Sequence, residues 1–281
     1  ELKLLIESIK ENELTSDSRL FIFSEAPKPN NQVDKGKVQV VRRIIKKING
    51  FKSVNIFESN EHKGLSVSVI SGVTKVLKEY GRAIVLEDDL VLSSNYLEYM
   101  NQALSYYEND NNIISVSGYT LPLKSINKNK DYYFGYRASS WGWGCWWDQW
   151  KNIDWSVSDY GELLKKRSEQ RKFNKGGSDL TRMLKNQQSG KIDSWAIRFC
   201  FHQYKYDLKT VFPTVSKVVS TGFSKDATNT VGATRFKTLL DSGEKKTFQF
   251  DPYQKIDVQL MKEFKNYYST YHRMLNKIKN I

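Results

Sequence analysis

Residues 1–120 alternate between short apolar runs and longer segments in which apolar side chains recur every three or four positions. Short apolar runs bounded by turn residues are typical of buried strands, and the longer spacing is typical of helices that bury one face. The pattern predicts strands at residues 19–23, 54–57, 83–86 and 113–117. It predicts helices at residues 1–9, 38–48, 65–80 and 94–107. Strands that alternate with helices favour an α/β fold with a mainly parallel sheet covered on both faces.

The second half of the chain follows this alternation less clearly. Residues 132–137 and 210–212 are predicted as strands, and residues 160–171 and 194–206 as helices. Five tryptophans lie between Trp141 and Trp150, in a segment that no helical period explains. We expect one domain, large enough to be a catalytic domain, over residues 1–240 and a C-terminal basic amphipathic segment over residues 241–281. A sheet of this kind normally opens with a buried strand, whereas the first element predicted here is a helix. We therefore also expect either that the first strand of the sheet is missing or that the fold differs.

The C-terminal segment carries an apolar stripe at helical spacing, surrounded by lysines and arginines. The stripe comprises Leu260, Phe264, Tyr267, Tyr271, Met274, Ile278 and Ile281. A helix of this kind either docks on the body of the protein or lies on an anionic membrane surface. The pattern leaves both open, so peripheral membrane contact is one of our expectations.

Composition narrows the class of protein. The chain has 281 residues, of which 39% are hydrophobic and 27% charged, and this excludes a disordered chain. No apolar run reaches the roughly 18 residues that span a bilayer, and no signal-peptide pattern opens the sequence. The two cysteines, Cys145 and Cys200, are too few for a disulfide scaffold. They predict a reducing, cytoplasmic compartment and leave a single disulfide open.

The charge balance points to an anionic partner. The formal net charge is +13, which favours a nucleotide, a phosphorylated substrate or a phospholipid face. The basic residues are dispersed and no nucleic-acid-binding motif accompanies them, so we do not expect a nucleic-acid partner.

Three adjacent acids, Glu87, Asp88 and Asp89, directly follow the predicted strand at residues 83–86. Adjacent carboxylates repel one another and are costly to bury without a positive partner. Oxygen ligands suit Mg²⁺ or Mn²⁺, and α/β sheets bind ligands beyond the carboxyl ends of their strands. The pattern therefore predicts a cation that meets a diphosphate, with a solvated turn before the next helix as the alternative.

Several segments, in matching order over residues 1–230, resemble GT-A glycosyltransferases, especially bacterial polysaccharide-type enzymes and the Golgi N-acetylglucosaminyltransferase I family. Residues 84–97 resemble the nucleotide-sugar motif. Residues 136–144, 173–177 and 191–196 resemble acceptor-side segments, and residues 221–228 resemble the late nucleotide-side loop. The resemblance implies a GT-A-like (Rossmann-like), mainly parallel sheet flanked by helices, with an elaborated acceptor-side half.

The same resemblance implies an activity and its donor-side residues. It implies a metal-dependent, inverting hexosyl- or N-acetylhexosaminyltransferase that moves a sugar from a nucleotide-sugar, with UDP-sugar expected, to a glycan or lipid-linked acceptor. The pathway would be bacterial surface polysaccharide assembly at the inner face of the membrane. Asp89 would be the direct ligand of Mn²⁺ or Mg²⁺, with Glu87 and Asp88 beside the donor sugar and ribose. Ser24 and Glu25 would lie near the nucleoside.

The acceptor side needs a general base, because the attacking hydroxyl must lose a proton. Asp193 would be this base; alternatively it caps the helix that follows it, since Asp is a favoured cap residue. Asp179 is the second candidate for the base. Aromatic faces pack against sugar rings, so we expect one of two tryptophans to touch sugar and the rest to lie in the core. The expected acceptor side comprises Trp141, Trp143, Gly176, Gly177 and Asp179.

Two other functions remain open at the level of the sequence. A nucleotidyltransferase also places carboxylates and a metal on an α/β sheet, but usually carries a Gly-rich phosphate loop that this sequence lacks. A carbohydrate-binding module would use the tryptophan cluster and has no need for three acids at a strand end.

Overall fold

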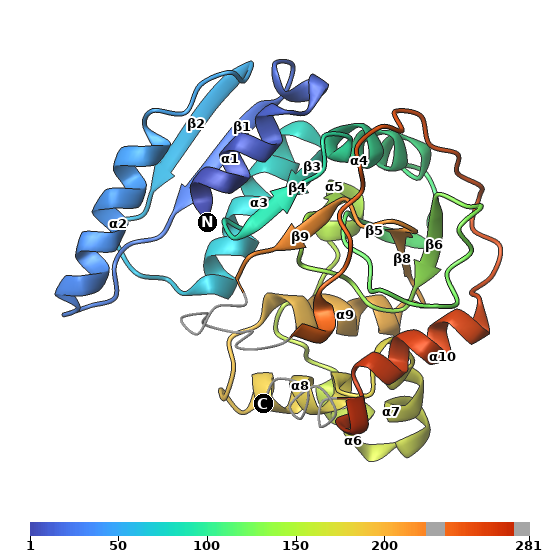
Figure 1. Cartoon of the computed structure of the whole chain (residues 1–281). Coiled ribbons are helices and arrows are strands. Elements are labelled where there is room, and N and C mark those ends of the chain that lie inside the picture. Colours follow the sequence, from blue (N-terminus) through green and yellow to red (C-terminus); the bar gives the residue numbers. More distant parts are fainter. Residues whose placement is uncertain (223–233, 273–281) are drawn as a thin grey trace.

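The computed structural model describes residues 1–222 and 234–272, which adopt a mixed α/β architecture (Figure 1). The strands are β1 (Arg19–Ser24), β2 (Ser53–Glu58), β3 (Arg82–Val85), β4 (Leu90–Leu92), β5 (Ile113–Ser117), β6 (Tyr132–Gly135), β7 (Trp143–Trp146), β8 (Lys209–Pro213) and β9 (Val218–Ser220). The α-helices are α1 (Leu2–Lys10), α2 (Gln32–Ile45), α3 (Leu65–Tyr80), α4 (Tyr96–Tyr106), α5 (Trp147–Trp150), α6 (Tyr160–Lys165), α7 (Arg167–Phe173), α8 (Leu180–Gln188), α9 (Trp195–Lys205) and α10 (Val258–Tyr267). Short 3₁₀ turns are η1 (Glu13–Thr15), η2 (Asn174–Gly176) and η3 (Thr234–Phe236).

The described strands form a five-stranded sheet and two two-stranded sheets. In the larger sheet the order is β3-β7-β5-β8-β6, and only β5 and β8 are parallel neighbours. β7 runs antiparallel to both β3 and β5, and β6 runs antiparallel to β8. β1 pairs with β2 in parallel, whereas β4 pairs with β9 in antiparallel. The α/β class is confirmed, but the expectation of a mainly parallel sheet is wrong, because the sheet is mixed.

Two strands make the sheet mixed, β6 and β7, and β7 is the one that the sequence pattern did not predict. Its four residues are all buried, and the strand lies inside the sheet between β3 and β5. Trp143 and Cys145 point into one apolar cluster and Trp146 into the other, as the period of two in a strand requires. Because helices cover both faces here, no alternation of polar and apolar residues marks the strand.

Two apolar clusters cover the faces of this sheet. One holds residues of α4, β5 and α10, including Tyr99, Leu104 and Phe264. The other holds residues of α3, α8 and α9, including Leu77 and Phe199. Within the described part of the chain, no strand joins β1 to β3, although α3 packs against both. The expected missing strand stays a prediction.

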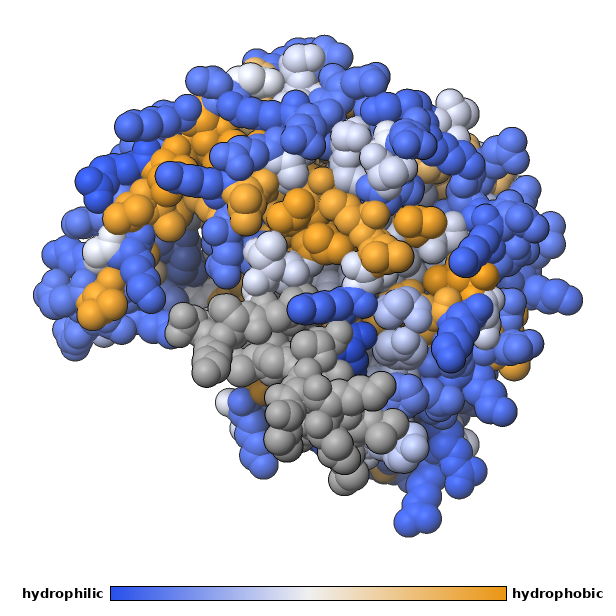
Figure 2. Space-filling model, viewed as in Figure 1, coloured by the Kyte–Doolittle hydropathy of each residue, from blue (hydrophilic) through white to orange (hydrophobic). Residues whose placement is uncertain are grey.

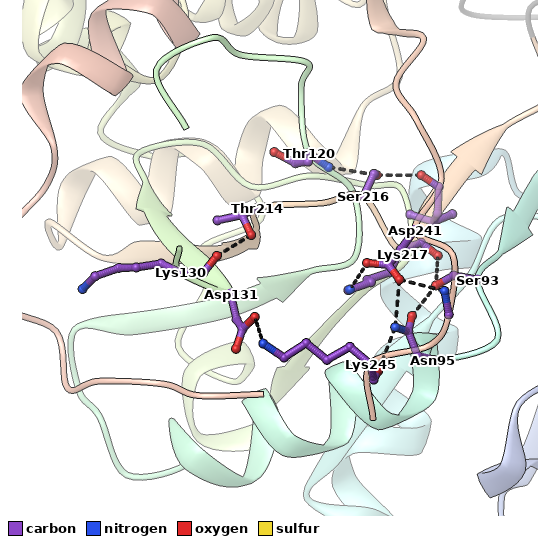
Figure 3. Close-up of polar contacts among 12 residues, drawn as sticks. Ser93, Asn95, Thr120, Lys130, Asp131, Thr214, Ser216, Lys217, Asp241 and Lys245 are labelled. Carbon is purple, nitrogen blue, oxygen red and sulfur yellow. Dashed lines mark hydrogen bonds and ion pairs between the residues drawn. The ribbon is translucent and has the colours of Figure 1, made fainter. Parts of the chain in front are cut away.

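The segment from Asp241 to α10 wraps around the body of the protein and completes its core. Asp241 forms an ion pair with Lys217 (2.6 Å) and accepts a hydrogen bond from the side-chain amide of Asn95 (3.0 Å), as Figure 3 shows. Further along, the Tyr107 hydroxyl donates to the carbonyl of Asp251 (2.8 Å). These contacts hold residues 241–251, which we call the C-terminal strap, against α4.

Helix α10 docks on the body through the first half of the predicted stripe. The Asp257 carboxylate accepts a hydrogen bond from Leu260 N–H (2.9 Å) and so caps the helix. Leu260, Met261 and Phe264 are buried in the core, whereas Tyr271 is exposed. The docking alternative is thus confirmed for the described residues. The rest of the stripe, Met274, Ile278 and Ile281, lies outside them.

Both cysteines lie in the described part of the chain, where Cys145 and Cys200 are buried and unpaired. The alternative of a single disulfide is therefore wrong. Among the described helices, none combines the length and the apolar character that crossing a bilayer needs.

Candidate active site

The acidic triplet leaves β3 at its carboxyl end, and Asp89 is the most constrained of the three acids. Its Oδ2 accepts a hydrogen bond from Ser220 Oγ (2.9 Å), and its carbonyl oxygen accepts one from Thr221 N–H (2.7 Å). A Cβ atom added to Gly222 would lie 2.1 Å from Asp89 Oδ2, so a side chain at this position would displace the carboxylate. The end of β9 therefore fixes the Asp89 carboxylate in place.

The other oxygen of this carboxylate, Oδ1, is buried and has no hydrogen-bond partner in the described residues. A buried carboxylate oxygen without a partner costs free energy, and a cation would offset that cost. The pKa of Glu87 is raised to about 8, mainly by burial and to a smaller extent by the negative charges of Asp89 and Asp88. Burial, and next the charge of Asp89, also raise the pKa of Asp88, although its side chain reaches the surface.

The arrangement of carboxylates around Asp89 limits which metal ions could bind there. Among the described residues, no three acidic, histidine or cysteine side chains converge on one point as in a protein-only metal cage. Mg²⁺ and Mn²⁺ need no such cage, because one or two carboxylates and the phosphates of a substrate can hold them. The donor set around Asp89, with its unpartnered oxygen, fits a cation held in this way.

Ser24 and Glu25 lie at the carboxyl end of β1, where Arg42 of α2 organises the loop. The Arg42 guanidinium donates to Ser24 Oγ (3.4 Å) and to the carbonyl of Ser59 (2.6 Å). Glu25 Oε1 accepts from Lys63 N–H (3.2 Å), while its Oε2 is buried without a partner among the described residues. Sequence reasoning missed Arg42, because nothing in the helical pattern distinguishes it from a surface arginine.

Asp193 lies beside the loop that joins β2 to α3. Its Oδ2 accepts a hydrogen bond from Ser66 N–H (3.1 Å), in the first turn of α3. Arg198 Nη2 lies 3.7 Å from its Oδ1. The side chain remains 54% exposed. The alternative that Asp193 caps the following helix is wrong, because Ser194 caps α9 instead.

The structure thus brings Glu25 and Asp193 to one loop, residues 59–64. Lys63 contacts Glu25, and a Cβ atom on Gly64 would lie 3.3 Å from Asp193 Oδ2. Gly64 has φ +82°, a left-handed conformation in which glycine is favoured. Since these carboxylates are 168 positions apart in the sequence (193 − 25), only the tertiary structure could place them here.

The two tryptophans expected on the acceptor side differ in environment. Trp143 is 2% exposed and stacks on Trp195, with ring centroids 4.8 Å apart. Its stacking with Trp150 (5.8 Å) covers it further, so it belongs to the core and the sugar-contact prediction for it is wrong. Trp141 is only partly buried and packs edge to face against Tyr119 (4.6 Å). Trp141 stays a predicted sugar contact.

Gly176, Gly177 and Asp179 surround a buried arginine that sequence reasoning did not weigh. Arg137 donates to both oxygens of Asp179 (2.8 and 3.4 Å), and its guanidinium lies 3.8 Å from the centre of the Tyr268 ring. A Cβ atom on Gly177 would lie 2.4 Å from Arg137 Nη1, and one on Gly176 would lie 2.5 Å from the carbonyl of Tyr136.

This packing explains both glycines without an acceptor. The Asp179 side chain is 12% exposed and both of its oxygens are engaged by Arg137, which disfavours it as a base; the second candidate for the base stays a prediction. Asp179 positions Arg137. The arginine lies inside the segment 136–144 that carries the family resemblance, and that was the only signal available for it.

The expected late nucleotide-side loop begins beside Asp89, at Thr221 and Gly222, and its residues 223–228 lie outside the described residues. Two surface cavities, of about 240 and 410 Å³, lie elsewhere and contain none of the candidate residues. No protein-family model matches this chain, and no curated protein sequence matches it either.

Proposed function

We propose that this protein is a metal-dependent, inverting glycosyltransferase that uses a nucleotide-sugar donor, with UDP-sugar as the expected class. The observation that carries the proposal is the Asp89 carboxylate. It is fixed at the end of a sheet strand by Ser220, next to two further acids, and keeps one buried oxygen without a partner in the described residues. A divalent cation bound to a diphosphate supplies the missing positive charge.

The chain's own groups have distinct roles in this proposal. Asp89 holds the cation, which when bound offsets the charge that develops on the departing nucleoside diphosphate. Glu87 and Asp88 lie beside the donor sugar and ribose. Ser24 and Glu25 line the nucleoside end, and Arg42 fixes the Ser24 hydroxyl and the neighbouring loop.

Asp193 serves as the general base. The Ser66 N–H and the Arg198 guanidinium hold its two oxygens, so the carboxylate is fixed in direction before the acceptor binds. Because the Asp193 side chain is 54% exposed, its oxygens keep lone pairs that can take the proton of the acceptor hydroxyl as that hydroxyl oxygen attacks the anomeric carbon. Attack from the face opposite the departing diphosphate inverts the configuration at that carbon. The acceptor in this proposal is a glycan or a lipid-linked glycan of a surface polysaccharide.

A screen of nucleotide-sugars with Mn²⁺ or Mg²⁺ and saccharide acceptors tests the proposal, with release of nucleoside diphosphate as the readout. Asp89→Asn and Asp193→Asn should each lower turnover by at least about 10²-fold, the usual contribution of a positioned acid or base. Asp148→Asn is the matched control, because that carboxylate is 83% exposed and lies in α5, whose first residue bonds the Gly81 carbonyl at the opposite end of β3 from the three acids. Full activity in Asp89→Asn would overturn the metal assignment.

The same reactions separate the alternatives. Release of pyrophosphate in place of nucleoside diphosphate would identify a nucleotidyltransferase. Saccharide binding that survives Asp89→Asn, with no turnover of any donor, would identify a binding module. Proton NMR of the first product reports the anomeric configuration directly, and retention would exclude the role proposed for Asp193.

A further inference from the structure

Helix α2 carries two apolar stripes, one more than a surface helix needs. The inner stripe, which includes Val41 and Ile45, faces the strands, and Ile45 is fully buried. The outer stripe is formed by Val33 and Val40, which are seven positions apart and therefore lie on the same face. Their side chains are 71% and 46% exposed. Valine is a weak helix former, so helix propensity does not account for these positions.

Basic side chains surround the outer stripe. Lys37 and Arg43 lie on the same side of α2, and Lys47 follows in the turn after the helix. All three are exposed, and none of them lies within ion-pair distance of an acid in the part of the chain that the structure describes. The only acid on the helix, Asp34, points elsewhere and accepts a hydrogen bond from Lys28 N–H (2.7 Å). We call Val33, Lys37, Val40, Arg43 and Lys47 the outer face of α2.

Helix α2 lies at the edge of the molecule (Figure 1). In the same view, Figure 2 shows small areas of apolar surface among the hydrophilic surface on that side. A face with two exposed valines and three cations that have no ion-pair partner in the described residues offers little apolar area to a protein partner. It matches an anionic bilayer, where cations attract the headgroups and short apolar side chains enter the interface.

We propose that the outer face of α2 binds an anionic phospholipid membrane. Helix α10 was the element expected to do so, but its stripe residues Leu260 and Phe264 are buried in the core. α2 begins directly after the loop that leaves β1, so Val33 and Lys37 lie at the same end of the fold as Ser24 and Glu25. Binding through α2 therefore brings this edge of the protein to the bilayer surface.

Vesicle flotation with the whole chain tests this proposal, and it does not depend on enzymatic activity. The vesicles are pure phosphatidylcholine, or phosphatidylcholine with phosphatidylglycerol. We expect binding only to the anionic vesicles, and its loss at high salt. Each lysine or arginine near such a surface changes partition by about fivefold, so Lys37→Gln, Arg43→Gln and Lys47→Gln together should weaken binding by about 10²-fold.

The control removes the same number of charges from another helix. Arg182→Gln, Lys185→Gln and Lys191→Gln are all at exposed positions in or near α8, and this variant should float like the wild type. Val33→Ser with Val40→Ser should weaken binding without changing its salt dependence. Circular dichroism and the melting temperature of each variant confirm that it is folded. Failure of the wild type to float with anionic vesicles, or equal losses in the α2 and α8 variants, would overturn the proposal.

Discussion

The buried ion pair between Lys217 and Asp241 joins the C-terminal strap to the body, and we expect it to dominate the strap's contribution to stability. The two side chains are 4% and 12% exposed, and the Lys217 ammonium lies 4.6 Å from the centre of the Phe248 ring. Figure 3 shows that Asn95 binds the same carboxylate. Asp241→Asn keeps the shape of the side chain and leaves the ammonium buried without its counter-charge.

Removal of one partner of a buried ion pair costs about 3–5 kcal/mol, because the other charge remains desolvated. That is a large share of the roughly 5–15 kcal/mol that stabilises a typical protein. Lys217→Met leaves the Asp241 carboxylate without the ammonium, but that carboxylate is the more exposed partner and still accepts hydrogen bonds from Asn95 and from Gly243 N–H, so this variant should cost less. The double variant Lys217→Met with Asp241→Asn should be more stable than Asp241→Asn alone. The measurement is the free energy of unfolding from urea denaturation, followed by circular dichroism and tryptophan fluorescence.

The pH dependence provides an independent check. Burial lowers the pKa of Lys217, and loss of Asp241 should lower it further. When the folded pKa of a lysine lies below its unfolded value, the unfolded state binds more protons, and stability rises with pH. The deficit of Asp241→Asn should therefore be smaller at pH 9 than at pH 6. A cost below about 1 kcal/mol, or strict additivity in the double variant, would refute the reasoning, because either result means that the two charges do not interact strongly.

Three further predictions concern the site and its surroundings. Gly222→Ala should push a methyl group toward Asp89 Oδ2, which lies 2.1 Å from the ideal Cβ position, and so lower the proposed transferase turnover while changing the melting temperature little; turnover equal to wild type would contradict this. Because the folded pKa of Glu87 is about 8, above its unfolded value, its stabilising protonation is fully present below the unfolded pKa of about 4.5 and is lost as pH rises through 8. The melting temperature of the apo-protein should thus fall more steeply over this window than that of Glu87→Gln, and parallel curves would exclude it. Trp143→Ala should cost about 3–5 kcal/mol in urea denaturation, and Trp141→Ala clearly less, since only the former is fully buried; similar costs would argue against their different environments.

Several elements were predictable because their signals are local. The apolar spacing predicted the helix at residues 65–80, and α3 has these bounds. The short apolar runs predicted strands at 19–23 and 113–117, which β1 and β5 confirm to within a residue. The acids after β3 were also visible, because a run of charges at the end of a buried strand is a feature of the sequence itself.

The tertiary structure alone decided which elements meet. β7 pairs with β3 on one side and with β5 on the other, and a strand that is covered on both faces shows no alternation of polar and apolar residues in the sequence. The contacts of Asp193 with α3 and of Asp179 with Arg137 join residues far apart in the chain. A side chain's type limits what it can bind, but long-range packing determines which groups come within reach. The sequence therefore indicated the chemistry that we propose for the site, and the fold determined which carboxylates remain free for it.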